Sequence, residues 1–519
     1  MLNKTTRLSV TQQDLGRVKA DLLVVGLFQS APKIPKNLLN LNQISGNLIQ
    51  NLLNLRDFQG KLHENSLLYP QKPSFPRLML IGLGEEKSLQ LNHLRQTAAL
   101  AVRAAEKLAA PRVALALHAP LGESGWGGQW ERVGQAIAEG AIVGRYDYQE
   151  FLSPPKDRKR VVEGMEVLLI DRRSGVASKL AAGVRVGRVL GEAQNRARAI
   201  DNRPGNEINP AELGRQAQRL ARRYGLRCRV YDERRLAQMG MNALLAVGSG
   251  SAAKPRLIEL EYRGRRGRGG RGRRPDVVLV GKAITFDSGG ISIKPSQNME
   301  TMKYDKSGGC DVLGVLTGLA ELRLPLDVAG LIPAAENLPS GTSYRPGDIV
   351  RTYGGKTVEI QNTDAEGRLI LCDALAYAAA KRPGAIVDLA TLTGACAVAL
   401  GEHHAGLFGN REDLRKELEE AAARSGEAVW AMPSGSEYLE QMKSKMADLK
   451  NTGGREGGAC TAAAFLQEFV GQAAWAHLDI AAVADSDKEK PYRGVGATGF
   501  GVRLILEWLR ARRKRAQGE

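Results

Sequence analysis

The residues Asp276–Val280 read DVVLV, and the stretch Gly281–Gly290 that follows reads GKAITFDSGG. A short apolar run rich in valine predicts a buried strand, and the glycine-rich polar stretch predicts a turn at the strand's carboxyl end. In an open α/β sheet, ligands bind outside the carboxyl ends of the strands. Asp287 is therefore a candidate site residue, although a turn with a capping aspartate is the simpler interpretation of this segment alone.

Strand and helix patterns alternate on both sides of this stretch. A helix is predicted at Gly308–Leu322, and a further helix has Asn209 as its cap, Pro210 in its first turn and Gly225 at its end. We predict a larger C-terminal α/β domain over 205–519, with a mixed, mostly parallel sheet flanked by helices. Its other predicted strands are Pro255–Tyr262, Val328–Pro333, Ala385–Leu389 and Ala476–Ile480.

The N-terminal part also has an α/β pattern. Over 1–173 we predict a smaller α/β domain, and over 174–204 a connecting helix and linker, because Ser174–Ala199 has one long helical pattern. The predicted strands of the smaller domain are Ala20–Phe28, Arg77–Gly84 and Glu166–Asp171, and its predicted helices are Leu94–Leu108 and Val133–Val143.

Positive charge is concentrated in two short segments. The chain of 519 residues has a formal net charge of +18, of which seven charges lie in the Arg/Gly-rich loop 263–274 (RGRRGRGGRGRR) and five in Arg510–Arg515 (RARRKR). Without them the excess is 18 − 7 − 5 = +6. Such segments bind nucleic acid through its phosphates, so a nucleic-acid partner is an alternative function, although no helix-turn-helix, zinc finger or aromatic platform accompanies them.

Several classes of protein are excluded by composition. No apolar run approaches the ~20 residues that cross a bilayer, which predicts no membrane association. Met1–Leu15 has no apolar core of a secretory signal, and the five cysteines form no CxxC pair. Both features favour a cytoplasmic, reducing location. With six histidines and no HExxH pair, a metal site would have to be built from carboxylates.

Carboxylates cluster in two further segments. Asp305 lies in Met302–Gly309 (MKYDKSGG) before the predicted helix, where a helix cap is the commoner role. Asp364 and Glu366 lie in Asn362–Leu369 (NTDAEGRL). If the backbone there is extended, both point to one side, and a divalent cation would relieve their repulsion. A solvated turn is the alternative.

The segment NTDAEGRL is identical to the signature of the leucyl aminopeptidases, the family that includes cytosol aminopeptidase. The resemblance covers about 300 residues of the C-terminal half in the same order, whereas the N-terminal domain resembles the family only loosely. The other resembling segments are VGKAITFDSGGISIKP (Val280–Pro295), MKYD (Met302–Asp305), DLATLTGA (Asp388–Ala395), ADLKNTGGREGGACTAAAFL (Ala447–Leu466), WAHLDIA (Trp475–Ala481) and GATGFGV (Gly496–Val502).

The resemblance implies a dinuclear metallo-exopeptidase. Two divalent ions, Mn²⁺ or Zn²⁺, would activate a bridging water, and Asp287 and Glu366 would bridge the ions. Lys294 and Arg368 would be the catalytic residues, the first stabilising the oxyanion and the second holding a bicarbonate that acts as general base; without the resemblance both would be taken as surface charges. The implied metal ligands are Lys282, as a neutral amine, Asp287, Asp305, Asp364 and Glu366.

The resemblance also implies a substrate pocket and an assembly. A leucine-like side chain would contact Met302, Asn362, Ala365 and the backbone of Thr391 and Leu392. Peptides would be the substrates and a homohexamer the assembly, and an inactive scaffold is disfavoured because every motif residue is present. The chain departs from the family in Lys306–Asp311 (KSGGCD), where relatives usually carry small apolar residues. His477 is expected to be a structural, hydrogen-bonded histidine.

Overall fold

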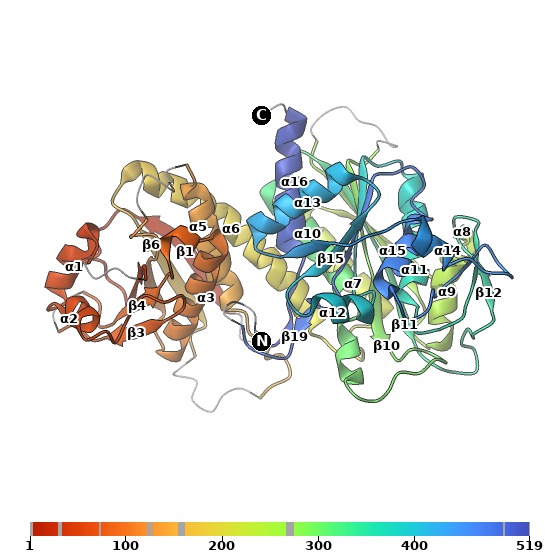
Figure 1. The fold of residues 1–519 in the computed structure, drawn as a ribbon, viewed down its shortest axis with the longest axis horizontal. Helices are drawn as coiled ribbons and strands as arrows, with labels where there is room; N and C mark the ends of the chain where they lie inside the picture. The colour runs from red at the N-terminus through yellow and green to blue at the C-terminus, as the bar shows by residue number, and fades with distance from the viewer. Residues whose placement is uncertain are drawn as a thin grey trace. The chain divides into compact units, whose positions relative to one another are not determined.

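The computed structural model describes residues 4–29, 34–71, 74–121, 126, 128–153, 161–265, 274–490, 492 and 494–517, with side chains up to 513. The chain forms two compact units, one of Met1–Glu192 with Lys488–Val495 and one of Ala193–Asp487 with Gly496–Glu519. Each unit consists of a β-sheet with helices on its faces (Figure 1), and the predicted two-domain α/β fold class is confirmed.

A six-stranded sheet forms the centre of the first unit, in the order β1-β6-β5-β2-β4-β3. Neighbouring strands are parallel except for the antiparallel pair of β3 and β4. The strands are β1 (Thr5–Thr11), β2 (Leu22–Leu27), β3 (Asn65–Leu68), β4 (Leu78–Gly82), β5 (Arg112–Ala116) and β6 (Gly164–Ile170).

Both faces of this sheet are covered, which is why the strands β2 and β4 are apolar and buried throughout. Val24 of β2 packs into one core with the helices α3 (Leu91–Lys107) and α5 (Trp130–Gly144). Its neighbour Val25 points to the other face and packs with α1 (Leu39–Ile44) and α2 (Leu48–Asn54). The first residues of the long helix α6 (Ser174–Asp201) join the first of these cores.

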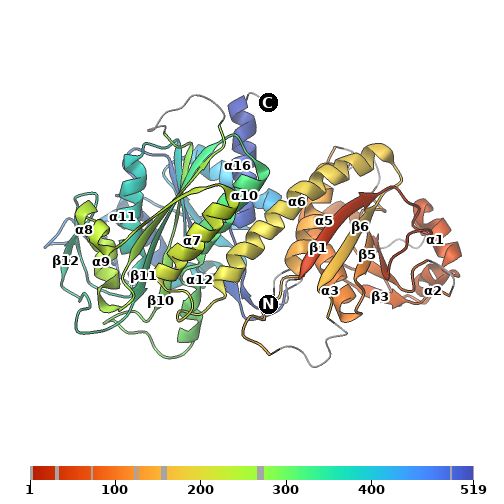
Figure 2. The ribbon, with the colours of Figure 1, turned by 180° about the vertical axis from the view of Figure 1, so that it is seen from behind.

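The sheet of the second unit has nine strands, in the order β16-β15-β18-β14-β9-β11-β8-β7, with β10 paired to β11. Figure 2 labels β10 and β11 beside each other. Its four central strands, β18, β14, β9 and β11, are parallel to one another, so their carboxyl ends share one edge. The strands are β7 (Arg227–Tyr231), β8 (Arg256–Arg263), β9 (Val277–Gly281), β10 (Ala283–Asp287), β11 (Asp327–Asn337), β14 (Ala385–Ala390), β15 (Ala405–Gly409), β16 (Val429–Ala431) and β18 (Trp475–Asp479).

Helices cover both faces of the second sheet as well. Ala329 and Leu331 of β11 belong to the core that contains α9 (Asn242–Val247), α11 (Gly367–Ala380) and α15 (Gly458–Gln467). Gly330 between them faces the opposite side, where a Cβ atom would lie 2.6 Å from Leu316 of α10 (Ser307–Leu322). The helix α16 (Val502–Gln517) packs against α10 and against α13 (Glu412–Ser425).

The predicted boundaries were accurate where capping chemistry defines them. The helix α7 runs from Pro210 to Tyr224; the Asn209 side chain accepts a hydrogen bond from the Glu212 N–H at 2.9 Å, and Gly225 ends the helix with φ +68°. The strand predicted to end at Pro333 instead continues to Asn337, because β10 pairs with its last residues.

The basic segments are only partly within the described residues. Residues 266–273 of the Arg/Gly-rich loop lie outside them, and Arg510–Arg515 continues α16 rather than forming a separate tail. Arg510 donates to Glu507 at 2.6 Å and Arg512 to Glu417 at 3.4 Å, so two of these charges are paired. Among the described residues, the helices include none long and apolar enough to span a membrane.

Candidate active site

Polar side chains gather at the carboxyl edge of the second sheet. Lys282 follows β9 directly, Asp287 ends β10, and Thr391 follows β14. The parallel register brings these strand ends together, and the turns before α10 and α11 add three more carboxylates: Asp305, Asp364 and Glu366. The five residues that the resemblance implied as metal ligands thus lie at one place in the fold.

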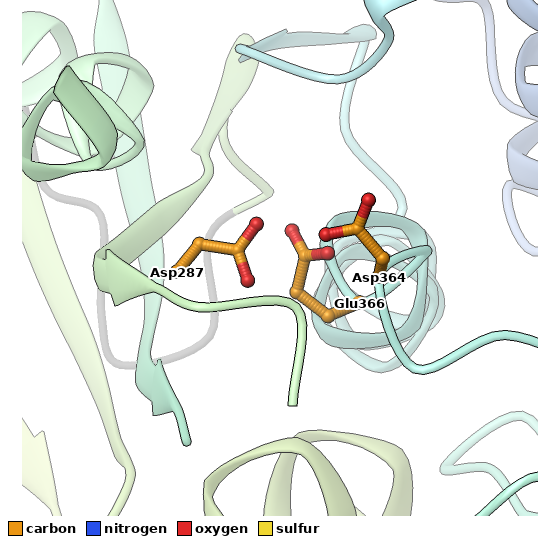
Figure 3. Close-up of side chains that lie close together, drawn as sticks. All are labelled: Asp287, Asp364 and Glu366. Atoms are coloured by element: carbon orange, nitrogen blue, oxygen red, sulfur yellow. The ribbon is translucent and has the colours of Figure 1, made fainter. Parts of the chain in front are cut away.

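Three of the carboxylates form a compact cluster. One oxygen each of Asp287, Asp364 and Glu366 can be chosen so that all three lie within 4.8 Å of one another, and the side chains point toward a common centre (Figure 3). Asp287 and Glu366 are buried, and Asp364 is half-buried. This proximity of like charges favours a bound cation.

The backbone at Asp364 and Glu366 differs from the expected one. The two residues do not lie on an extended strand: Asp364 lies in a turn, and Glu366 has helical dihedral angles (φ −76°, ψ −37°) at the start of α11. Asn362 makes the turn, since its Oδ1 accepts the Asp364 N–H at 2.8 Å. The two side chains therefore converge through a turn into a helix and not through strand alternation, and the solvated-turn alternative is wrong for the buried Glu366.

Asp305 is an ion-pair partner and not a helix cap. Lys306 occupies the N-cap position of α10, with no side-chain capping bond. Asp305 Oδ1 instead lies 2.8 Å from Lys282 Nζ and accepts a hydrogen bond from Thr391 Oγ1 at 2.7 Å. Lys282 Nζ also lies 2.8 Å from Glu366 Oε1 and donates to the Thr391 carbonyl at 2.7 Å. Lys282 thereby joins the segments before α10, before α11 and after β14.

Two glycines are required by this close approach. A Cβ atom at Gly367 would lie 2.7 Å from both Nζ and Cε of Lys282, so any larger residue would displace the lysine. Gly289 has φ +87°, which side-chain-bearing residues rarely adopt, and a Cβ atom there would meet the Ser292 carbonyl at 2.5 Å. The tight turn at Gly289 returns the chain, so that the Lys294 N–H donates to the Ser288 carbonyl at 2.9 Å.

The loop after β10 brings Lys294 into the carboxylate cluster. Lys294 Nζ lies 2.8 Å from Asp287 Oδ2 and also contacts Asp364 Oδ1. Burial lowers the pKa of Lys294, but Asp287 and Glu366 raise it more, so the pKa lies above its ordinary value. The surface-charge interpretation of Lys294 is wrong, because the side chain is directed at the cluster.

The local charge balance is negative. Four carboxylates, Asp287, Asp305, Asp364 and Glu366, face two ammonium groups, a difference of 4 − 2 = 2 negative charges. Burial raises the pKa of Asp287 and Asp305, and repulsion by Glu366 raises both further. Burial lowers the pKa of Lys282, but its carboxylate neighbours raise it more. A lysine ligand must be a neutral amine, so that role of Lys282 stays a prediction.

Asn337 was missed by the sequence analysis. This fully buried side chain ends β11, and its Nδ2 donates to Asp287 Oδ1 at 2.8 Å and to the Thr363 carbonyl at 3.0 Å. It thus fixes Asp287 relative to the turn that carries Asp364. The signal was available in principle, because Asn337 is a polar residue at the carboxyl end of a strand parallel to β9.

Arg368 lies in the first turn of α11 and is 8% exposed, so it is not a surface charge. Burial lowers the pKa of its guanidinium to about 10, although Glu366 and Asp479 oppose the shift. Its Nε is buried without a hydrogen-bond partner among the described residues. An unpartnered buried donor of positive charge is suited to a small anion.

The residues implied for substrate binding lie around the same edge. Met302 belongs to the 3₁₀ helix η5 (Met299–Tyr304), and Leu392 follows Thr391 and packs against the core around α11. Asn362 and Ala365 flank Asp364, and all five implied residues are half-buried. Asn451 holds this turn, because its Oδ1 accepts the Gln361 N–H at 2.8 Å and its Nδ2 donates to the Asn362 carbonyl at 2.6 Å.

The donor set fits divalent ions. Carboxylate oxygens are ligands for Mn²⁺ and Zn²⁺. The excess of two negative charges in the cluster would be compensated by the positive charge of a bound ion. Asp305 Oδ2 is buried and has no hydrogen-bond partner among the described residues, so a ligand oxygen is free. His477 is not part of this set: its Nδ1 lies 2.6 Å from Asp388 Oδ1, and both side chains are fully buried.

Comparison with known proteins identifies the family. The catalytic-domain profile of the cytosol aminopeptidase family matches residues 195–506, and the N-terminal-domain profile of the same family matches residues 24–155. The chain belongs to the cytosol aminopeptidase family. It is therefore a metal-dependent aminopeptidase, a hydrolase that removes residues from the N-termini of peptides.

Individual relatives cover most of the chain. A probable cytosol aminopeptidase of Roseiflexus castenholzii is 42% identical over 97% of this chain and 99% of its own length, and one of Aquifex aeolicus is 48% identical over 73% and 74%. Among solved structures, a mutant of tomato leucine aminopeptidase aligns with a TM-score of 0.85 at 32% identity, covering 97% of this chain and 96% of its own. The bottromycin maturation enzyme BotP in complex with Mn aligns with a TM-score of 0.81 at 34% identity, covering 95% and 100%.

Proposed function

We propose that this aminopeptidase uses two divalent ions, Mn²⁺ or Zn²⁺, and prefers peptides with leucine-like N-terminal residues. The observation that carries the proposal is the convergence of four carboxylates with a two-charge negative excess at the sheet edge. The Mn complex of BotP, whose fold this chain shares, supports it. The ligands in this proposal are Lys282, Asp287, Asp305, Asp364 and Glu366.

When bound, two divalent ions supply Lewis acidity toward the scissile carbonyl, the attacking water and the free amine of the peptide. Lys294 acts as a cationic donor to the oxyanion of the tetrahedral intermediate, which its place beside Asp287 and Asp364 allows. Arg368 holds a bicarbonate that accepts the proton of the water, because a guanidinium remains protonated and is itself a poor base. The unpartnered Nε of Arg368 supports this role.

Substrate preference follows from the half-buried residues near the carboxylates. Met302 and Ala365 present apolar atoms, which favour a branched aliphatic side chain over a charged one. Asn362 and Thr391 complete the proposed pocket. A homohexamer is the proposed assembly, and a cytoplasmic location is proposed from the likeness to cytosol aminopeptidases.

Hydrolysis of leucine p-nitroanilide by protein loaded with Mn²⁺ or Zn²⁺ tests the proposal. We expect the wild type to hydrolyse this substrate and to bind two ions per chain. In Asp364→Ala we expect turnover to be lost and fewer than two ions to be bound. Valine, lysine and glutamate p-nitroanilides measured in parallel test the preference. No turnover with any divalent ion, or unchanged turnover in Asp364→Ala, would contradict the two-metal proposal; a preference for a charged residue would contradict only the pocket.

A further inference from the structure

Lys306 follows the candidate ligand Asp305 but points away from the carboxylates. Its side chain is fully buried, and its Nζ donates to the backbone carbonyls of Asp201 at 2.7 Å and Arg203 at 2.9 Å, and to that of Lys303. We call these three oxygens the carbonyl cage. An ammonium group has three hydrogens, so the cage takes up its full donor capacity.

The carbonyl cage joins segments that are far apart in the sequence. Asp201 is the last residue of α6, where helix carbonyls lack intrahelical partners and a positive charge is favourable. Arg203 lies in the turn that follows, and Lys303 belongs to η5. The contacts are reinforced by Ser307, whose Oγ donates to Asp201 Oδ2 at 2.6 Å, and the Asp201 Oδ1 atom lies 3.8 Å from Lys306 Nζ.

The backbone of Asp305 is anchored in two ways, through the neighbouring Lys306 side chain and through its own carbonyl group. On one side the Lys306 ammonium is bound to the Lys303 carbonyl and to the end of α6. On the other side the Asp305 carbonyl accepts the Ile284 N–H of β10 at 3.1 Å. The Asp305 carboxylate has few conformations left and faces Lys282 and Thr391.

We propose that Lys306 is a positioning residue for metal binding: its ammonium, held in the carbonyl cage, fixes the backbone on which Asp305 presents its carboxylate. This inference rests on the proposed role of Asp305 as a metal ligand. Groups that orient metal ligands typically change metal affinity 10- to 100-fold when removed.

The test is a Mn²⁺ titration of the full-length protein, by calorimetry and by competition with a fluorescent chelator. We expect Lys306→Met, which keeps most of the length of the side chain but removes the charge, to weaken the affinity for one of two Mn²⁺ ions by about 10- to 100-fold. Lys303→Met is the matched control, because it removes a charge from the same turn, where Lys303 Nζ lies over the Tyr304 ring, and leaves the three carbonyls in place. It should bind both ions as the wild type does.

A second variant separates positioning from simple charge pairing. If Lys306 only neutralised Asp201, the double variant Lys306→Met with Asp201→Asn would bind Mn²⁺ as tightly as Asp201→Asn alone. The positioning role predicts that thermal stability recovers in the double variant while the Mn²⁺ affinity stays low. Lys306→Gln retains two N–H donors for the cage, and it should give an intermediate affinity even if Lys306→Met does not fold.

The outcomes also distinguish this inference from the proposed function. Asp305→Ala should lose one Mn²⁺ ion; if it retains both with normal affinity, Asp305 is not a ligand and the proposed function fails in that part. If Asp305→Ala loses an ion while Lys306→Met and Lys306→Gln both bind two ions with wild-type affinity, the ligand assignment stands and the positioning role of Lys306 is wrong.

Discussion

The two α/β units of the chain differ in the balance of charged side chains at the carboxyl ends of their central strands. In the first unit, His118 after β5 and Asp171 after β6 lie at the carboxyl edge, 3.2 Å apart, and Arg173 binds Asp171 through its backbone N–H, Nε and Nη2 at 2.7 to 3.0 Å. One carboxylate there faces a guanidinium and an imidazole. In the second unit, four carboxylates face two ammonium groups at the corresponding edge.

The difference separates a strand-end carboxylate that is occupied by hydrogen bonds from carboxylates that retain capacity for a ligand. Both oxygens of the buried Asp171 carboxylate accept hydrogen bonds from Arg173, which leaves little capacity for a further ligand. A group of carboxylates with excess charge and a free oxygen, such as Asp305 Oδ2, still requires compensation. The same position in the same fold class is therefore a salt bridge in one unit and a candidate metal site in the other.

Asp287→Asn should have the largest effect on activity of the substitutions that test this difference between the two units. The substitution keeps the shape of the side chain but removes one of the four negative charges, and the amide is a poor metal ligand. We expect kcat/KM for leucine p-nitroanilide to fall about 10³-fold, which corresponds to about 4 kcal/mol of transition-state stabilisation. The metal content should fall as well. A variant with wild-type turnover and two bound ions would remove the distinction between the two edges.

Asn337→Ala should produce the next largest effect. Asn337 donates to Asp287 Oδ1 and to the Thr363 carbonyl from a fully buried position. Its loss should weaken Mn²⁺ binding or kcat/KM about 10- to 100-fold, as is usual when a group that orients a metal ligand is removed. Asn42→Ala offers a matched control, since Asn42 is a buried asparagine of the first unit. If Asn337→Ala and Asn42→Ala reduce activity equally, the effect is one of stability and not of the site.

The sequence predicted the strands and the segments that carry the clustered carboxylates better than the geometry that joins them. β9 is a continuous apolar run, and the apolar runs of β14 and β18 are interrupted by Asp388 and His477. Together with the unambiguous cap of α7, these local patterns define the elements. The convergence of Asp287 with Asp364 depends on sheet order and on the turn at Asn362, which are non-local. Asn337 was missed because β11 extends past Pro333 only where β10 pairs with it.

Asp171→Asn should change stability and not activity. Burial raises the pKa of Asp171, but hydrogen bonds from His118 and Arg173 lower it more, so the net pKa lies below its ordinary 3.8. The charged form therefore stabilises the folded state above about pH 4, and this contribution is lost as the pH falls below that value. Charged hydrogen bonds of this kind contribute about 2 kcal/mol.

The measurement for Asp171→Asn is amide hydrogen exchange in β5 and β6, together with thermal unfolding at about pH 7 and about pH 3. The variant should lose protection at the higher pH and differ less from the wild type at the lower pH, while its kcat/KM stays unchanged. A loss of activity without a loss of protection would give Asp171 a chemical role and make the two edges alike.

Asp311→Ala tests a carboxylate that has neither a fixed cation nor a place in the cluster, and its effect should be the smallest. Asp311 is 1% exposed in α10, and neither oxygen has a hydrogen-bond partner among the described residues. Burial raises its pKa well above the ordinary value, and repulsion by Asp201 and Glu427 adds to the shift. A raised carboxyl pKa means that the folded state loses stability as the pH rises above the unfolded value of 3.8.

We therefore expect Asp311→Ala to be more stable than the wild type, by about 1 kcal/mol near pH 8 and by less near pH 4, since an unpartnered buried polar group costs about 1 to 3 kcal/mol and the small cavity offsets part of the gain. Chemical unfolding of the second unit at both pH values measures the difference. A variant that is less stable than the wild type near pH 8 would mean that the Asp311 carboxylate is stabilised in the folded state. Uncompensated buried negative charge would then also occur outside the cluster of Asp287, Asp305, Asp364 and Glu366, and it would not by itself indicate a functional site.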